Sequence, residues 1–268
     1  HDCTIFEEYP ELGGMMTFGI PGYRTPREVL DGEIKRIIDM GVEVKLNTRV
    51  GRDVSIEQLE KDYDSILWAI GTVVGRSLPI PGSDAPNCVD GMSYLKAYNE
   101  NRLKYLSGRI LVIGAGDTAM DVVAVARCIG NISHPTGKDR PENVILGFTT
   151  HDVASVAKRQ GGDVWIVYRR PLDKAPATKH ELDSVLREGV EFHDGLAPLE
   201  VIQDETGRAI ALRVQPVEWK DGEMSNKGEP QDIECAMIVT ATGQTGNYEG
   251  LEELDNGRGL IDADKLYQ

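Results

Sequence analysis

The chain has 268 residues, of which 40% are hydrophobic, 27% are charged and 6% are aromatic, a composition typical of a globular protein with one or two domains. Lys and Arg number 29 against 44 Asp and Glu, and the formal charge of -15 disfavours nucleic acid and anionic membrane surfaces as partners. No stretch approaches ~18 uninterrupted apolar residues, and no secretory signal is visible at the start. We therefore expect a cytoplasmic protein without a membrane span.

The first part of the chain alternates short strands and helices. Alternating apolar residues indicate strands, and Thr25-Pro26 has the form of a helix start. The glycines Gly41 and Gly71 mark the ends of two elements. They predict strands over 3–6, 42–46 and 65–70 and helices over 26–40 and 55–61. The apolar run over 65–70 has the form of a strand in the core of a sheet.

A proline-rich stretch, Pro79–Pro86, is the best candidate for a linker, because three prolines and a glycine in eight residues exclude regular structure. We place a domain boundary there. Beyond it, helices are predicted over 92–103, 118–128 and 178–188 and strands over 109–113, 164–168, 191–192, 209–217 and 237–240. This alternation predicts an α/β fold with a parallel sheet and crossover helices.

The strongest motif lies between the strand 109–113 and the helix that follows it. A side chain at Gly114 would block the turn, one at Gly116 would collide with a pyrophosphate, and Ala119 allows the helix to lie close to the strand. The helix N-terminus then offers N–H groups to the anion. The predicted dinucleotide-binding residues here are Gly114, Ala115, Gly116, Asp117, Thr118 and Ala119.

The end of the next convincing strand carries two arginines, Arg169 and Arg170, where an NAD site typically has an acidic residue. Guanidinium groups pair with a 2′-phosphate, so NADPH is favoured over NADH, which stays possible. The alternative is a solvated basic strand end. Arg169 follows Gly116 by 53 residues, whereas a spacing of about 20 is usual, which indicates an insertion over 130–162.

Two further strands end on glycine turns, at Gly71 and at Ala241-Thr242-Gly243. Each could be a point where the chain leaves one dinucleotide-binding sheet for another. Each could equally be an ordinary buried strand with its turn.

The four cysteines stand tens of residues apart, at Cys3, Cys88, Cys128 and Cys235. They form no CxxC pair, so we expect reduced, mostly buried thiols and neither a redox disulfide nor a zinc or iron–sulfur site. The histidines show no metal-ligand spacing either.

In combination, these motifs resemble the small (beta) subunit of glutamate synthase and its relatives. The segments that carry the resemblance are Gly13-Gly14 through Pro21, Arg24-Thr25-Pro26, the GAGDTAMD run from Gly114, Tyr168-Arg169-Arg170 and the two glycine turns. The resemblance implies two Rossmann-like domains, an FAD domain interrupted by an inserted NAD(P)H domain. It also implies that Glu7 holds the adenosine ribose of FAD and that Gly13 and Gly14 lie beside the flavin.

The resemblance assigns residues 1–86 to a partial FAD-binding domain, 87–245 to the NAD(P)H-binding domain and 246–268 to an incomplete return to the first. The family's first glycine motif, its later Gly-Asp segment and its cluster-binding cysteines are missing, so we expect an FAD domain truncated at both ends and iron–sulfur clusters only in missing parts of a parent protein. The 130–162 insertion is more similar to the DsrL-type member associated with dissimilatory sulfite reductase.

The function implied is an NAD(P)H-dependent flavoprotein oxidoreductase that passes hydride from NADPH to FAD and electrons on to an iron–sulfur or protein acceptor. The acidic surface suggests such an acceptor, or a sister subunit, as the partner. No catalytic acid or base residue is predicted, because hydride transfer is the chemistry of the cofactors. Two alternatives are a non-catalytic NADPH-binding module and a thioredoxin-reductase-like enzyme, which the lack of CxxC disfavours.

Overall fold

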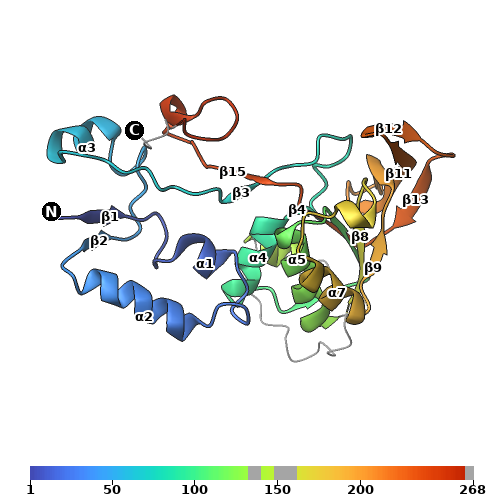
Figure 1. Cartoon of the computed structure of the whole chain (residues 1–268), viewed down its shortest axis with the longest axis horizontal. Coiled ribbons are helices and arrows are strands. Elements are labelled where there is room, and N and C mark those ends of the chain that lie inside the picture. Colours follow the sequence, from blue (N-terminus) through green and yellow to red (C-terminus); the bar gives the residue numbers. More distant parts are fainter. Residues whose placement is uncertain (132–139, 148–161, 263–268) are drawn as a thin grey trace. The chain divides into compact units, whose positions relative to one another are not determined.

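The computed structural model describes residues 1–131, 140–147 and 162–262 (Figure 1). The chain divides into two compact units: His1–Val74 with Gln244–Gln268 form unit 1, and Gly75–Gly243 form unit 2. The first division thus lies earlier than the expected boundary at residue 86, and the second lies close to the expected 245. The predicted α/β class is confirmed.

Unit 1 is built on a small parallel pair of strands, β1 and β2, in which Thr4 pairs with Glu43 and Phe6 with Lys45. Its elements are β1 (Thr4–Phe6), α1 (Gly14–Phe18), α2 (Arg27–Ile38), β2 (Glu43–Lys45), α3 (Ile56–Asp62), β15 (Gln244–Thr245) and the 3-10 helix η2 (Glu252–Leu254). Ser55 caps α3 by accepting the Gln58 N–H. Strand β3 (Val74–Gly75) pairs with β15 in a two-stranded sheet.

The predicted core strand over 65–70 is wrong. These residues form no strand, and Leu67 is 87% exposed. An apolar run becomes a strand only where a neighbouring strand accepts and donates its backbone hydrogen bonds. Among the described residues of unit 1, β1 and β2 pair with each other, and neither pairs with this segment.

Unit 2 is a larger α/β body with a five-stranded parallel sheet and a four-stranded antiparallel sheet. Its first half contains β4 (Cys88–Asp90), α4 (Gly91–Asn99), β5 (Tyr105–Leu106), β6 (Arg109–Ile113), α5 (Asp117–Cys128), β7 (Gly130–Asn131) and α6 (Pro141–Ile145). Its second half contains β8 (Asp163–Val167), the 3-10 helix η1 (Leu172–Lys174), α7 (Lys179–Arg187), β9 (Glu191–His193), β10 (Leu196–Gln203), β11 (Ala209–Lys220), β12 (Glu223–Asn226), β13 (Gln231–Glu234) and β14 (Met237–Thr240).

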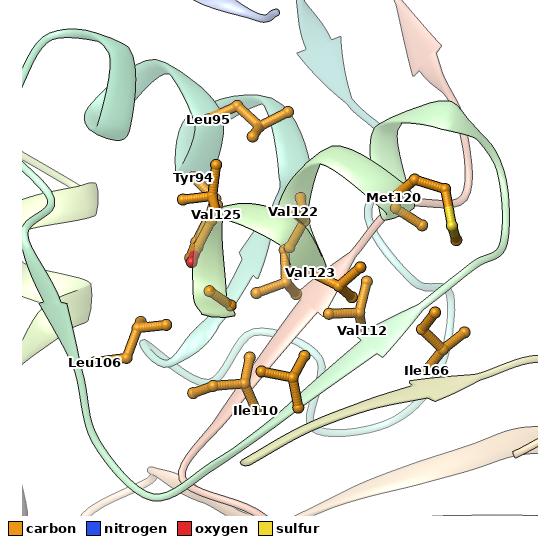
Figure 2. Packing of buried hydrophobic residues seen from close by; sticks show 14 of the residues in the cluster. Tyr94, Leu95, Leu106, Ile110, Val112, Met120, Val122, Val123, Val125 and Ile166 are labelled. Carbon is orange, nitrogen blue, oxygen red and sulfur yellow. The ribbon is translucent and has the colours of Figure 1, made fainter. Parts of the chain in front are cut away.

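The parallel sheet has the strand order β4-β14-β6-β8-β9, with β6 at its centre. Alternate residues of β6 face opposite sides, as the pleat requires. Ile110 and Val112 pack with α4, α5 and α7, while Leu111 and Ile113 pack with the antiparallel strands. Figure 2 shows the helix-side core, in which α4 and α5 place side chains over β6 and β8. The labelled residues are Tyr94, Leu95, Leu106, Ile110, Val112, Met120, Val122, Val123, Val125 and Ile166.

The proline-rich stretch predicted as a linker is docked in unit 2. The Pro81 carbonyl accepts the Val201 N–H at 2.9 Å, and the Gly82 carbonyl accepts the Gln203 side-chain amide at 3.0 Å. Ala85 is 3% exposed in the core beneath the antiparallel sheet. These contacts explain why residues 75–86 belong to unit 2, because prolines exclude regular elements without excluding burial.

Asn87 joins the two sheets of unit 2. Its fully buried side-chain amide donates to the carbonyls of Ala209 and Ala236 and accepts the Ala209 N–H, each at 2.8 Å. Ala209 begins β11, and Ala236 directly precedes β14. All three hydrogen bonds are made inside the protein, where an unpaired amide would be costly.

The thiols are less buried than the sequence suggested: Cys3 and Cys128 are exposed, and Cys88 and Cys235 are half-buried beside the second core. Within the described part of the chain, no helix combines the length and the apolar content needed to cross a membrane. Across residues 1–131, 140–147 and 162–262, no group of three His, Cys, Asp or Glu side chains is arranged to hold a metal ion.

Candidate nucleotide-binding site

Gly114 forms the turn between β6 and α5 in a conformation that requires glycine. Its φ is 129°, a value that side-chain-bearing residues rarely adopt. A Cβ built on Gly114 would lie under 3.0 Å from the carbonyl oxygen of Ala241, which follows β14. The Gly114 N–H donates to the Val167 carbonyl of β8 at 3.2 Å. Gly114 therefore brings the ends of β6, β8 and β14 close together.

Gly116 is different, because the fold itself does not require a glycine there. It is the N-cap of α5 with φ -93° and ψ -177°, which any residue can adopt, and a built Cβ would meet no atom within 4 Å. No side chain caps this helix start. Gly116 therefore leaves the space of a side chain open at the start of a 12-residue helix, where the positive end of the helix dipole lies.

The remaining residues of the motif fix the helix to the sheet. Ala119 is fully buried, so α5 lies close to the parallel strands. The buried Ala115 offers its carbonyl to the Ala177 N–H at 3.0 Å, which ties the turn to the segment before α7. Asp117 is exposed and Thr118 is half-buried in the first turn of α5.

The Ala241-Thr242-Gly243 turn lies next to the β6–α5 turn. The Ala241 N–H donates to the Ile113 carbonyl at 2.8 Å, while Thr242 and Gly243 are exposed. From β6, the chain continues through β8 and β9 on one side of the sheet and returns as β14 on the other. The carboxyl ends of β6 and β14 thus form a topological switch point, where open parallel sheets bind their ligands.

Arg169 and Arg170 follow β8 at the same edge of the sheet, and both are exposed. Among the residues that the structure describes, neither guanidinium forms an ion pair. The Arg169 carbonyl accepts the indole N–H of Trp219 at 2.7 Å, and the Arg170 guanidinium lies 5.4 Å from the Trp219 ring centre. Sequence reasoning missed Trp219, since it lies 50 residues away from Arg169 along the chain.

The predicted flavin residues belong to unit 1, whereas the residues described above belong to unit 2. Glu7 follows β1, and its carboxylate accepts the Tyr9 N–H at 2.9 Å. Gly13 has φ 112°, and a built Cβ would clash with Thr17 of α1, so the start of that helix already requires this glycine. Gly14 is the first residue of α1, and Gly71 is exposed after the segment that forms no strand.

These unit 1 residues do not form an FAD cradle by themselves. In the parallel pair β1–β2, strand β1 is followed by a bent segment over 7–13 that leads to α1, and not by a tight glycine turn like that between β6 and α5. Of the four predicted residues in unit 1, Glu7 is the one with a carboxylate, the kind of acceptor that binds a ribose hydroxyl. Among the described residues, the glycine turn between a parallel strand and a helix is thus found in unit 2, between β6 and α5.

A glycine turn between a parallel strand and a helix, located at a topological switch point, defines an α/β protein of the dinucleotide-binding class. The chain belongs to the pyridine nucleotide-disulphide oxidoreductase family, whose model matches residues 10–268. It therefore belongs to a family of oxidoreductases.

Several curated relatives are named as subunits or chains of enzymes. The chain is 30% identical over 280 residues to the NADP(+)-dependent formate dehydrogenase subunit beta of Moorella thermoacetica, covering 99% of this chain and 35% of the relative. It is 29% identical over 238 residues to the glutamate synthase [NADPH] small chain of Escherichia coli, covering 84% and 43%. The chain thus spans a third to a half of the length of these relatives.

Solved structures share the fold. FprA of Mycobacterium tuberculosis, solved in complex with NADPH, has a TM-score of 0.74 and 19% identity, with coverage of 98% of this chain and 68% of FprA. Thioredoxin reductase of T. acidophilum has a TM-score of 0.56 and 12% identity, with coverage of 98% and 77%. The fold is therefore that of oxidoreductases with two dinucleotide-binding domains.

Proposed function

We propose that unit 2 binds NADPH and that the chain is the nucleotide-binding part of an NAD(P)H:acceptor oxidoreductase. The observation that carries this proposal is the contrast between the two glycines of the β6–α5 turn. The fold demands Gly114, whereas a side chain at Gly116, the N-cap of α5, would meet no atom of the protein within 4 Å of its Cβ. A glycine that the fold does not need, at the position where a pyrophosphate approaches the backbone, indicates a ligand.

Each predicted residue has a role in this proposal. The pyrophosphate accepts hydrogen bonds from backbone N–H groups at the start of α5, those of Gly116, Asp117 and Thr118. The 2′-phosphate of the adenosine ribose pairs with Arg169 and Arg170, whose guanidinium groups form no ion pair among the described residues. The turn Ala241-Thr242-Gly243, in which Thr242 and Gly243 are exposed, borders the dinucleotide on the β14 side.

The names of two relatives support NADPH, the nucleotide with a 2′-phosphate, while a third relative is named as NAD-dependent. The Moorella thermoacetica subunit is NADP(+)-dependent, the Escherichia coli chain carries NADPH in its name, and an NAD-dependent relative, the dihydropyrimidine dehydrogenase subunit PreT of Salmonella typhimurium, is 28% identical over 269 residues. The choice between the nucleotides therefore rests on Arg169 and Arg170.

Unit 1 contributes the second half of the proposal. Glu7, Gly13, Gly14 and Gly71 lie in it, and we assign them to the edge of an FAD site that other parts of a parent protein complete. When bound, FAD accepts hydride and releases single electrons. The onward acceptor is an iron–sulfur centre or protein in the parent or in a sister subunit, in keeping with relatives that are themselves named as subunits.

The sub-assignment to the DsrL-type relative stays a prediction. It rests on the 130–162 insertion, of which residues 132–139 and 148–161 lie outside the described residues.

Nucleotide affinities of arginine variants test the NADPH assignment. Hydrogen bonds to charged groups contribute about 1.5–3 kcal/mol, so Arg169→Ala should weaken NADPH binding by roughly 10- to 150-fold and leave NADH binding unchanged. Arg187→Ala is the matched control, because Arg187 is an exposed arginine at the end of α7 in the same unit. Equal losses for NADPH and NADH in Arg169→Ala would refute the assignment.

A visible absorption spectrum of the purified chain tests the flavin assignment separately. Bound flavin in the chain, or flavin binding on addition of FAD, would support an oxidoreductase that holds its own acceptor. A colourless chain that binds NADPH and gains no flavin would support the alternative, a non-catalytic NADPH-binding module.

A further inference from the structure

Trp219 reaches the nucleotide edge of the parallel sheet from the other sheet of unit 2. It lies near the end of β11, a 12-residue strand whose early residues pair with β10 and β13 and whose last four residues pair with β12. In that hairpin Trp219 stands opposite Met224. Strand β11 is thus long enough for its end to extend beyond β13 and contact the segment after β8.

Two contacts connect Trp219 to the arginine pair. Its indole N–H donates to the Arg169 carbonyl at 2.7 Å, a short and well-formed hydrogen bond. The Arg170 guanidinium lies 5.4 Å from the ring centre, within the range of a cation–π interaction. Trp219 as a residue is half-buried, and its side chain contacts the backbone of one arginine and the guanidinium of the next.

The rest of the segment is also held in place. The Tyr168 hydroxyl donates to the Lys174 carbonyl at 3.0 Å, and the Asp194 carboxylate accepts the Leu172 N–H at 2.8 Å. The Leu196 N–H donates to the Tyr168 carbonyl at 3.1 Å. Trp219 differs from these groups because it contacts Arg169 and Arg170 themselves.

We propose that Trp219 is a positioning residue for recognition of the 2′-phosphate: it holds Arg169 and Arg170 in the arrangement that distinguishes NADPH from NADH. This inference rests on the proposed function, because it assumes that the arginine pair binds the phosphate. Adjacent guanidinium groups repel each other, and ordering two long side chains costs conformational entropy. The Trp219 ring holds the Arg170 guanidinium before the ligand binds, and so reduces both the repulsion and the entropy cost of ordering. This is preorganisation of the binding site.

The selectivity ratio, the NADH dissociation constant divided by that of NADPH, measures this role in the full chain. Loss of one hydrogen bond and one cation–π contact together changes a dissociation constant about tenfold. Trp219→Leu should therefore lower the selectivity ratio about tenfold. Trp219→Phe keeps a ring and loses the N–H, so it should lower the ratio by about threefold. Ser225→Ala, on the facing strand β12, controls for changes in the hairpin itself and should leave the ratio unchanged.

Tryptophan fluorescence provides a second readout, with 2′,5′-ADP and 5′-AMP as probes. A phosphate that draws Arg170 toward itself changes the surroundings of the Trp219 ring, so 2′,5′-ADP should change the emission of wild type and 5′-AMP should change it less. The difference between the two probes should vanish in Trp219→Phe.

The outcomes separate this inference from the function on which it rests. If Arg169→Ala loses NADPH binding selectively while Trp219→Leu weakens both nucleotides equally or neither, the arginines bind the phosphate and the positioning role is wrong. If Arg169→Ala weakens both nucleotides equally, the phosphate assignment itself fails. A lower melting temperature of Trp219→Leu with an unchanged selectivity ratio also overturns the inference, because it shows a purely structural role.

Discussion

The two glycines of the β6–α5 turn predict opposite behaviour when each is replaced by alanine. At Gly116 a methyl group meets no atom within 4 Å, and φ -93° suits alanine. Alanine lowers the conformational entropy of the unfolded chain, which stabilises the folded state of Gly116→Ala by about 0.4–1 kcal/mol. Alanine is a poorer N-cap than glycine by a similar amount, about 0.5–1 kcal/mol. The free energy of unfolding should therefore change by less than about 1 kcal/mol.

Binding should respond strongly to the same change. The added methyl group occupies the space through which the pyrophosphate approaches the α5 N–H groups. Losing one charge-assisted hydrogen bond costs about 1.5–3 kcal/mol, so NADPH should bind roughly 10- to 150-fold more weakly to Gly116→Ala. Isothermal titration calorimetry measures this loss.

Gly114→Ala is the matched contrast. Its methyl group would lie under 3.0 Å from the Ala241 carbonyl oxygen, at φ 129°. Backbone strain of this kind costs about 1–3 kcal/mol before the clash is added, so Gly114→Ala should melt several degrees below wild type. Thermal unfolding followed by circular dichroism separates the two variants. A Gly116→Ala chain that melts like wild type and binds NADPH equally well would refute the assignment of this turn to the nucleotide.

Three further predictions concern the stability of unit 2. Asn87→Ala removes three buried hydrogen bonds and leaves their backbone partners unpaired, so the free energy of unfolding should fall by about 2–4 kcal/mol in a urea titration. Thr178→Ala removes the side chain that accepts the Glu181 N–H at the start of α7, which should cost about 1 kcal/mol by the same assay, and Thr178→Ser should retain most of it. Burial raises the pKa of the Cys88 thiol to about 11 and that of the Cys235 thiol to about 12, above their usual 9.0, so stability should decline as the pH rises above 9.

The sign of that pH dependence follows from the bound protons. Above pH 9 the unfolded chain releases both thiol protons while the folded chain keeps them, so unfolding becomes easier until the pH passes the folded pKa values of about 11 and about 12. A variant with both cysteines replaced by alanine should show a flatter curve over this range. An equally steep decline in that variant would show that other groups cause the pH dependence.

An Asn87→Ala chain that is as stable as wild type would contradict the role of the Asn87 amide in joining the two sheets.

The β6–α5 turn could be predicted from the sequence because its signals are local. The apolar run over 109–113, the spacing of Gly114 and Gly116 and the helix start all lie within a dozen residues. The structure confirms β6 over the predicted residues and begins α5 one residue earlier than predicted. The position of Arg169 and Arg170 could also be predicted from the sequence, because the pair directly follows a strand with a strong apolar pattern.

Two features depended on long-range contacts and could not be predicted in this way. The run over 65–70 has the apolar content of a core strand, but whether it becomes one depends on a neighbouring strand, which local pattern does not encode. Trp219 acts on Arg169 across 50 residues, through the end of a hairpin whose register the sequence does not fix. The docking of the proline-rich stretch on β10 is a third contact of the same kind.

Titration of the wild-type chain with NADPH and, separately, with NADH tests the central claim most directly. The structure predicts saturable binding at one site per chain, with NADPH at least about tenfold tighter than NADH, because one charge-assisted hydrogen bond to the 2′-phosphate is worth at least about 1.5 kcal/mol. Absence of saturable binding, or equal affinity for the two nucleotides, would contradict the account.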